Sequence, residues 1–161
     1  LLAGCGETAT DAAPPSGLAA KLPDDPGLNV IVVSFDALRP EALGVYGNDL
    51  PVSPHLDAFA EQAVVFDRAY SAANSTPTSF AAAFTGRFPF EVFLKWRLAD
   101  VPTVAETFSK AGYRTPGFFN NRQLDPDRNF GQGFDTYEVG YDPDEEAFLA
   151  QPLRCVEDMK G

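Results

Sequence analysis

Cysteine and histidine are scarce in this sequence of 161 residues. The two cysteines, Cys5 and Cys155, lie near opposite ends of the chain, and His55 is the single histidine. A disulfide framework or a zinc site needs more cysteines at closer spacing, so the sequence favours neither. Hydrolytic metal sites usually draw on several His and Asp ligands. His55 lies in the first turn of an expected helix, where we expect no catalytic role. Because the sequence has no other histidine, we expect any hydrolytic metal site in it to be incomplete.

Basic residues are also few. Lys and Arg number 12 against 23 Asp and Glu, the formal net charge is -11, and no basic cluster offsets it. A nucleic-acid-binding protein normally has a basic face, so we expect no nucleic-acid partner. An acidic surface does not attract anionic substrates over long range, so such a substrate would need a metal ion or a helix N-terminus close by. Hydrophobic residues, at 45%, suffice for a core, but no run approaches the length of a membrane span.

The chain opens without a methionine, on the residues LLAGC. The run LAGC resembles the bacterial lipobox, whose cysteine becomes the lipidated N-terminus; a chance run of small residues is the alternative. On the first interpretation, residues 1–4 are a signal-peptide remnant and residues 5–27 form a lipid-anchored flexible tether, rich in Ala, Pro, Gly and polar residues. We then expect acylation of Cys5 and a location in the bacterial cell envelope, on its periplasmic or extracellular face, with the membrane contacted through the lipid.

Strand and helix patterns alternate in the remainder of the chain. We expect strands over residues 28–35, 64–70 and 114–119, and helices that begin at Ser53-Pro54, span 76–84 and span 103–111. Strands that alternate with helices indicate an α/β fold with a mostly parallel sheet flanked by helices. The last twenty residues are acidic at first and contain no clear end to a domain.

Two positions in this pattern carry candidate chemistry. Asp36 directly follows the first expected strand, and ligands of parallel α/β sheets bind at the carboxyl ends of strands. It is therefore either a metal ligand or a turn residue. The segment 74–80, NSTPTSF, places several hydroxyls just before a helix. They either cap the helix or include a nucleophile held where helix amides favour an anion. Trp96, between Lys95 and Arg97, also has two interpretations. It either lines a substrate entrance or is an ordinary surface or core aromatic residue.

Several motifs resemble the sulfatase family in their order and spacing. Residues 36–47, DALRPEALGVYG, are similar to the family pattern D-x-L-R-P-D-x-L-G-x-Y-G, and residues 85–89, TGRFP, are similar to its T-G-R-x-P. Residues 53–60, SPHLDAFA, are similar to its T-P-N-L-D-x-L-A, and residues 133–135 match its G-F-D turn. The resemblance covers about residues 28–140. It implies that residues 28–161 are the N-terminal part of a truncated sulfatase-like domain, an α/β fold of the alkaline-phosphatase type that is incomplete in this chain.

The resemblance also implies roles for two residues. Asp36 matches the first metal ligand of the family, for Ca²⁺ or Mg²⁺ first and Zn²⁺ or Mn²⁺ as alternatives. Thr76, ten residues before Gly86, matches the nucleophile. Sulfatases oxidise a Cys or Ser there to formylglycine; threonine is not a substrate for that oxidation, so we expect no formylglycine. Ser75 is one residue out of register. Related phosphotransferases and phosphodiesterases use Thr or Ser directly, which favours phosphate-type esters.

Three functional hypotheses follow from the resemblance. The first is a metal-dependent hydrolase or transferase of sulfate or phosphate esters, acting outside the cytoplasm on a small-molecule, glycan or lipid ester. The second is a non-catalytic surface lipoprotein on the same fold, favoured by Ala37 and Phe80 in place of the family's Asp and Arg and by the absence of its G-K-W-H-L segment near residues 119–124. The third is an inactive truncated fragment.

Overall fold

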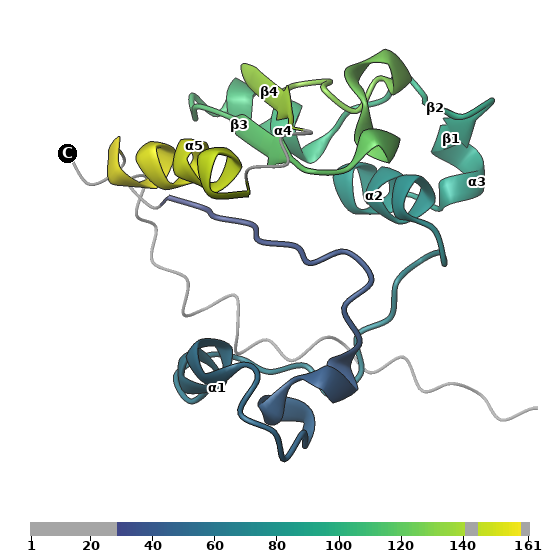
Figure 1. Cartoon of the computed structure of the whole chain (residues 1–161). Helices are drawn as coiled ribbons and strands as arrows, with labels where there is room; N and C mark the ends of the chain where they lie inside the picture. Colours follow the sequence, from purple (N-terminus) through teal and green to yellow (C-terminus); the bar gives the residue numbers. More distant parts are fainter. Residues whose placement is uncertain (1–28, 141–144, 159–161) are drawn as a thin grey trace, which may run out of the picture. The chain divides into compact units, whose positions relative to one another are not determined.

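A computed structural model describes residues 29–140 and 145–158 of the chain (Figure 1). All of its described helices and strands belong to one compact unit, which begins at Ser34. The expected signal-peptide remnant, the tether and the acylation of Cys5 lie outside the described residues. Cys155, on the last helix, is a half-buried free thiol.

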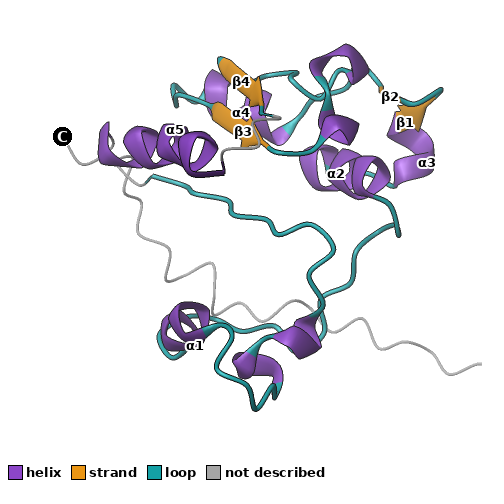
Figure 2. Ribbon diagram, viewed as in Figure 1, coloured by secondary structure: helices purple, strands orange, loops and turns teal. Residues whose placement is uncertain are grey.

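Short elements make up the described chain (Figure 2). The α-helices are α1 (Pro54–Ala60), α2 (Thr76–Thr85), α3 (Pro89–Val92), α4 (Val104–Lys110) and α5 (Glu145–Asp158). The strands are β1 (Phe93–Leu94), β2 (Arg97–Leu98), β3 (Pro116–Phe119) and β4 (Thr136–Val139). The 3₁₀ helices are η2 (Pro40–Ala42), η3 (Gly44–Tyr46), η4 (Arg122–Leu124) and η5 (Pro126–Arg128).

The predicted helices are confirmed, with local signals at their ends. Helix α2 follows Ser75 and ends at Gly86, whose φ of 66° lies in the left-handed region. Helix α4 begins with a capping box, in which the Thr103 hydroxyl accepts from the Glu106 backbone N–H at 3.1 Å and the Glu106 carboxylate accepts from the Thr103 N–H at 3.0 Å. Gly112 follows its last turn with a φ of 91°.

Ser53 precedes helix α1 as predicted, but its side chain does not cap the helix. Its hydroxyl donates to the Asp57 carboxylate at 2.9 Å and accepts from the Gly44 N–H at 3.0 Å. Asp57 also accepts from the Val45 N–H at 2.8 Å. These bonds attach α1 to the loop that follows Asp36 in the sequence.

Two of the predicted strands do not form. Residues 29–35 of the expected strand 28–35 belong to no sheet, and Val32 is 87% exposed; Leu28 lies outside the described residues. Residues 64–70 likewise form no strand, and Tyr70 is 86% exposed. β-branched and aromatic residues favour a strand, but the strand exists only where a neighbouring strand supplies backbone hydrogen-bond partners. In the described residues no strand pairs with either segment.

The predicted strand 114–119 is confirmed as β3. It pairs in parallel with β4, with Pro116 opposite Thr136 and Phe119 opposite Val139. Strands β1 and β2 form an antiparallel hairpin that the sequence did not predict. The described residues thus contain two separate two-stranded sheets, one parallel and one antiparallel. The parallel pair agrees with the predicted α/β class, and the larger, mostly parallel sheet stays a prediction.

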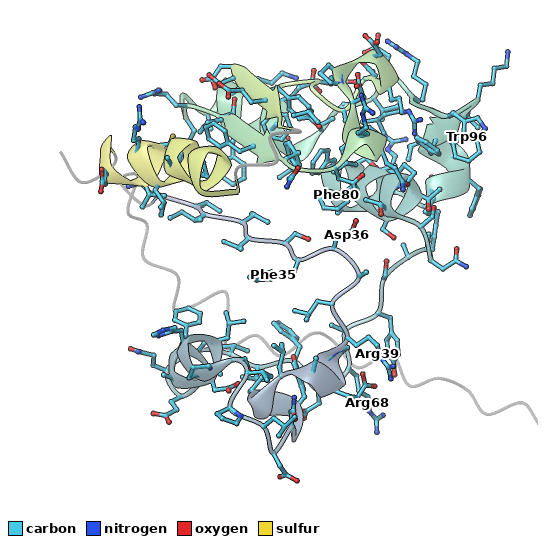
Figure 3. The ribbon with its side chains drawn as sticks, viewed as in Figure 1. Phe35, Asp36, Arg39, Arg68, Phe80 and Trp96 are labelled. Atoms are coloured by element: carbon cyan, nitrogen blue, oxygen red, sulfur yellow. The ribbon has the colours of Figure 1, made fainter. Side chains whose placement is uncertain are left out.

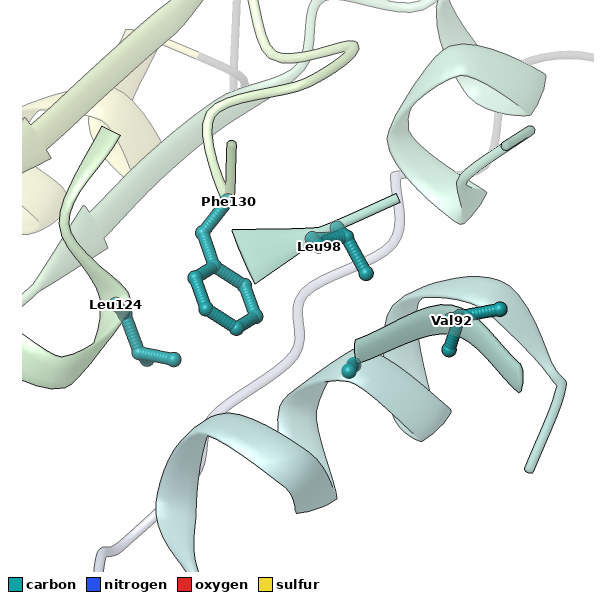
Figure 4. Packing of buried hydrophobic residues seen from close by; sticks show 5 residues of the cluster. Val92, Leu98, Leu124 and Phe130 are labelled. Carbon is teal, nitrogen blue, oxygen red and sulfur yellow. The ribbon is translucent and has the colours of Figure 1, made fainter. Parts of the chain in front are cut away.

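The core lies between α2, α3, the hairpin and the chain after β3 (Figure 4). Its buried members are Ala81, Val92, Leu98, Leu124 and Phe130. Phe84 contacts Phe130 edge to face, with ring centroids 6.2 Å apart. This core fixes α2 relative to β3 and η4, the elements that carry the candidate site. In the described part of the chain, no helix combines the length and the apolar character needed to cross a bilayer.

Candidate functional site

The candidate site is centred on Asp36, which directly follows the extended residues 29–35. Ala37 after it has a φ of 55°, in the left-handed region that is rare for a residue with a Cβ. The Asp36 side chain is exposed (Figure 3). Its carboxylate oxygens both lie 3.3 Å from the Thr76 hydroxyl, which donates to them. The structure thus brings together the two site residues that the sequence predicted, although 40 positions separate them.

Thr76 is the first residue of α2 and is half-buried. Pro77 after it is buried, and its ring fixes the backbone of the first helical turn. The neighbouring hydroxyls have other partners: Ser75 Oγ lies 2.6 Å from Thr78 Oγ1, and Ser79 Oγ donates to the Ala73 carbonyl at 2.8 Å. Within the hydroxyl cluster at residues 74–80, Thr76 is therefore the one that contacts Asp36.

Asn121 is a third site residue, which the sequence analysis missed. Its Nδ2 donates to Asp36 Oδ2 at 2.5 Å, and its Oδ1 accepts from the Gln123 N–H at 2.9 Å, so the amide is held at both ends. Asn121 precedes η4 and lies two residues after the end of β3. That position was the available signal, because Asp36 was selected for following a predicted strand in the same way.

Phe80 occupies the position of the arginine in the family pattern and belongs to the core. Its ring contacts Phe84 and Phe119 edge to face, with centroids 5.6 Å and 6.4 Å apart. The side chain at this position therefore supplies packing and no positive charge. Trp96 lies in the turn of the β1–β2 hairpin, where its ring contacts Phe93 edge to face.

The three side chains supply complementary functions. The Asp36 carboxylate accepts hydrogen bonds and can receive a proton, and the Thr76 hydroxyl is a nucleophile once its proton is accepted. Thr76 also lies at the N-terminus of α2, a helix of 10 residues, where free backbone N–H groups and the helix dipole favour an anion. Such an arrangement suits the transfer of an anionic group to a hydroxyl.

The oxygen atoms at the site are also of the type that binds a hard cation. Carboxylate and hydroxyl oxygens are ligands that Ca²⁺ and Mg²⁺ accept, but these ions need about six or more oxygens. Only one carboxylate is present, and residues 29–140 and 145–158 hold no group of three or more His, Cys, Asp or Glu side chains placed to bind a metal ion. The described residues therefore do not by themselves complete a site for such an ion.

Comparison with known proteins gives a consistent result. The sulfatase family model matches residues 28–155. An arylsulfatase of Clostridium perfringens is 33% identical over 108 residues, which cover 63% of this chain and 22% of the relative. Iduronate 2-sulfatase of Mus musculus is 30% identical over 113 residues, covering 61% of this chain and 20% of the relative. An ulvan-active sulfatase of Formosa agariphila is 30% identical over 122 residues, which cover 69% of this chain and 24% of the relative.

The chain thus spans between a fifth and a quarter of the length of these relatives. No solved structure matches it significantly.

Proposed function

The chain belongs to the sulfatase family, and we propose that the protein is a hydrolase or transferase of sulfate or phosphate esters that uses Thr76 as its nucleophile. The observation that carries this proposal is the hydrogen bond from the Thr76 hydroxyl to the Asp36 carboxylate at the start of α2. The relatives named above are all sulfatases, which supports ester hydrolysis as the reaction class. Two of them are named for uronate or polysaccharide substrates, which supports a glycan ester over a lipid ester.

The proposed step is an in-line displacement at phosphorus or sulfur. Thr76 Oγ1 forms the new bond while the bond to the ester oxygen breaks. The hydroxyl proton passes to the Asp36 carboxylate and from there to the leaving alkoxide, so that an alcohol departs. Water then attacks the threonine ester, releases the inorganic anion and restores the hydroxyl. A divalent cation bound by Asp36 would act as a Lewis acid that lowers the pKa of the hydroxyl.

Thr76 itself favours phosphate-type esters within this class. A threonine sulfate formed in the first half-reaction has no route to release except attack of water at sulfur. A formylglycine hydrate can instead expel sulfate by cleaving its own carbon–oxygen bond, but threonine cannot be oxidised to that aldehyde, because its methyl group would leave a ketone. The relatives' names point to sulfate and the nucleophile points to phosphate, so the substrate test must include both esters.

The decisive experiment compares 4-nitrophenyl sulfate and 4-nitrophenyl phosphate as substrates of the full-length protein. We expect Thr76→Ala to lose at least roughly 1,000-fold in kcat, whereas Thr76→Ser keeps a hydroxyl and much of the activity. Ser75→Ala is the matched control and should be nearly neutral, because Ser75 bonds to Thr78. Mass spectrometry should find residues 74–80 unmodified. An active Thr76→Ala variant, or an aldehyde at Ser75, would exclude Thr76 as the nucleophile.

A non-catalytic glycan- or partner-binding protein is the second candidate. The single carboxylate at the site and the core position of Phe80 favour it. Metal analysis of the purified full-length protein separates the two functions. A stoichiometric divalent ion that is lost in Asp36→Ala supports the enzyme, and a protein that holds no metal and has no turnover supports the binding function.

We also propose that the protein is held at the outer side of a bacterial membrane through an acyl chain on Cys5. The lipobox-like run LAGC supports this location. Cell fractionation of wild type and Cys5→Ser tests it: the wild type should sediment with membranes and the variant should not. A wild type found in the soluble fraction would contradict the anchor.

A further inference from the structure

The β1–β2 hairpin has an unusual turn. Leu94 pairs with Arg97, so the turn consists of Lys95 and Trp96, whose φ angles are 52° and 62°. A two-residue hairpin with both turn residues in the left-handed region is normally built from Asn-Gly or similar pairs, because other residues are strained there. Local strain of this kind persists mainly where a side chain has a function.

The turn presents one aromatic ring between two cations. Trp96 is 71% exposed (Figure 3). Its ring contacts the ring of Phe93 edge to face, with centroids 6.3 Å apart. In the described residues, no ion pair neutralises Lys95 or Arg97. One nitrogen of Arg97 donates to the Asp127 carbonyl at 2.8 Å, which fixes the guanidinium and leaves its other N–H groups available. Although the chain has a net charge of -11, these two neighbouring charges favour an anionic ligand locally.

A shallow recess of mixed polar and apolar lining lies beside the turn. Its lining combines apolar side chains with a guanidinium, a carboxylate and an amide, and consists of Leu94, Arg97, Leu98, Ala99, Asp100 and Asn129. Asp100 is exposed and can accept from hydroxyl groups. Sugar rings stack on aromatic faces and offer many hydroxyls, whereas a bilayer surface would have to desolvate the Asp100 carboxylate. The recess therefore favours a sugar chain over a membrane.

We propose that the hairpin turn and this recess form a binding surface for an anionic sugar chain, in which Trp96 stacks on a sugar ring and Lys95 and Arg97 contact its sulfate or carboxylate groups. The choice of a sugar, among the anionic ligands that carry a ring, rests on the proposed function. The existence of the binding surface is tested separately, by measurements of binding that need no turnover.

Trp96 is the only tryptophan of the chain, so its fluorescence reports directly on this surface. Titration of the 161-residue chain with dextran sulfate should change the emission saturably, and unsulfated dextran of equal length should bind at least roughly tenfold more weakly. Vesicles of phosphatidylcholine and phosphatidylglycerol should leave the emission unchanged. Saturable change with vesicles and none with dextran sulfate would identify a membrane surface and overturn the proposal.

The double variant Lys95→Asn/Trp96→Gly supplies the decisive control. It introduces the preferred turn sequence, so we expect it to fold at least as stably as the wild type, while dextran sulfate affinity, measured by affinity electrophoresis, falls at least roughly tenfold. Arg68→Gln removes an exposed positive charge elsewhere and should leave the affinity unchanged. Unchanged affinity in the double variant, or an equal loss in Arg68→Gln, would show that the turn is not the binding surface. If dextran sulfate binds as expected but the full-length protein has no turnover, only the proposed function is contradicted.

Discussion

Asn121 donates a hydrogen bond of 2.5 Å to the Asp36 carboxylate across 85 positions of the chain. The other end of its amide accepts from the Gln123 N–H, so rotation of the side chain would break two bonds. Asp36 in turn accepts from Thr76. The carboxylate that contacts the proposed nucleophile is therefore oriented by a residue from a different element.

Removal of this amide tests its positioning role. In the full-length protein, Asn121→Ala should lower kcat by about 10- to 100-fold with little change in KM, because Asp36 loses the bond that orients it. Asn121→Asp should be worse, since it places a second negative charge beside Asp36. Steady-state kinetics measure both variants, and a purely structural role would instead lower the melting temperature without changing kcat.

Gly133 permits close packing against the capping box of α4. Its φ is 86°, and an added Cβ would overlap the Glu106 backbone nitrogen and lie 2.9 Å from Thr103 Oγ1. We expect Gly133→Ala to destabilise the protein by more than the roughly 1–2 kcal/mol of left-handed strain alone. Gly112→Ala is the matched control, because its φ is 91° and its added Cβ meets no atom within 4 Å. Urea denaturation measures the unfolding free energy of both variants. Equal losses in Gly133→Ala and Gly112→Ala would show that the structure relaxes to remove the overlap at Gly133.

The same capping box makes stability depend on pH. The hydrogen bond from the Thr103 backbone and then the one from Gln132 hold the pKa of Glu106 below its usual value, although desolvation opposes them. A depressed pKa contributes stability that is present above the unfolded-state pKa, about 4.3, and is lost as pH falls through the lower folded-state pKa. Urea midpoints between pH 6 and pH 3 should therefore fall less in Glu106→Gln, which keeps a capping side chain. Parallel pH profiles in the two proteins would contradict this coupling.

Phe130 should be a major contributor to core stability. Its side chain is 0% exposed and contacts Phe84 and Phe93. Phe130→Ala should cost about 3–5 kcal/mol of unfolding free energy through lost burial and a residual cavity. Phe90→Ala, at a ring that is 74% exposed, is the control and should change stability by about 0.5 kcal/mol or less. Comparable losses at both positions would mean that Phe90 is covered in solution.

The sequence predicted those features that depend on neighbouring residues. Helices α2 and α4 were predicted, and the signals that the structure shows at their ends, Gly86 after α2 and the Thr103–Glu106 pair at the start of α4, act over a few positions. The strands expected over 28–35 and 64–70 failed because pairing requires a distant partner, which propensity does not encode. The pairing of Asp36 with Thr76 was accessible only because the resemblance to a family placed both residues.

Two features escaped sequence analysis for different reasons. Asn121 is one of two adjacent asparagines after a strand; that position marks the segment, but nothing local distinguishes Asn121 from Asn120. The β1–β2 hairpin was missed because Lys95 and Trp96 lack the Asn or Gly that signals such a turn. In both cases tertiary contacts, and not local preference, determine the conformation.

The Phe80–Phe119 contact joins the helix that begins at Thr76 to the strand that leads to Asn121. An arginine in place of Phe80 would hold its neighbours through charge, which dissolved ions weaken. Contact between aromatic rings is not screened in this way. This ring packing holds α2 against β3 without relying on charge, so we expect Thr76 and Asn121 to keep their relative positions in concentrated salt solution, even where the bonds to the Asp36 carboxylate weaken.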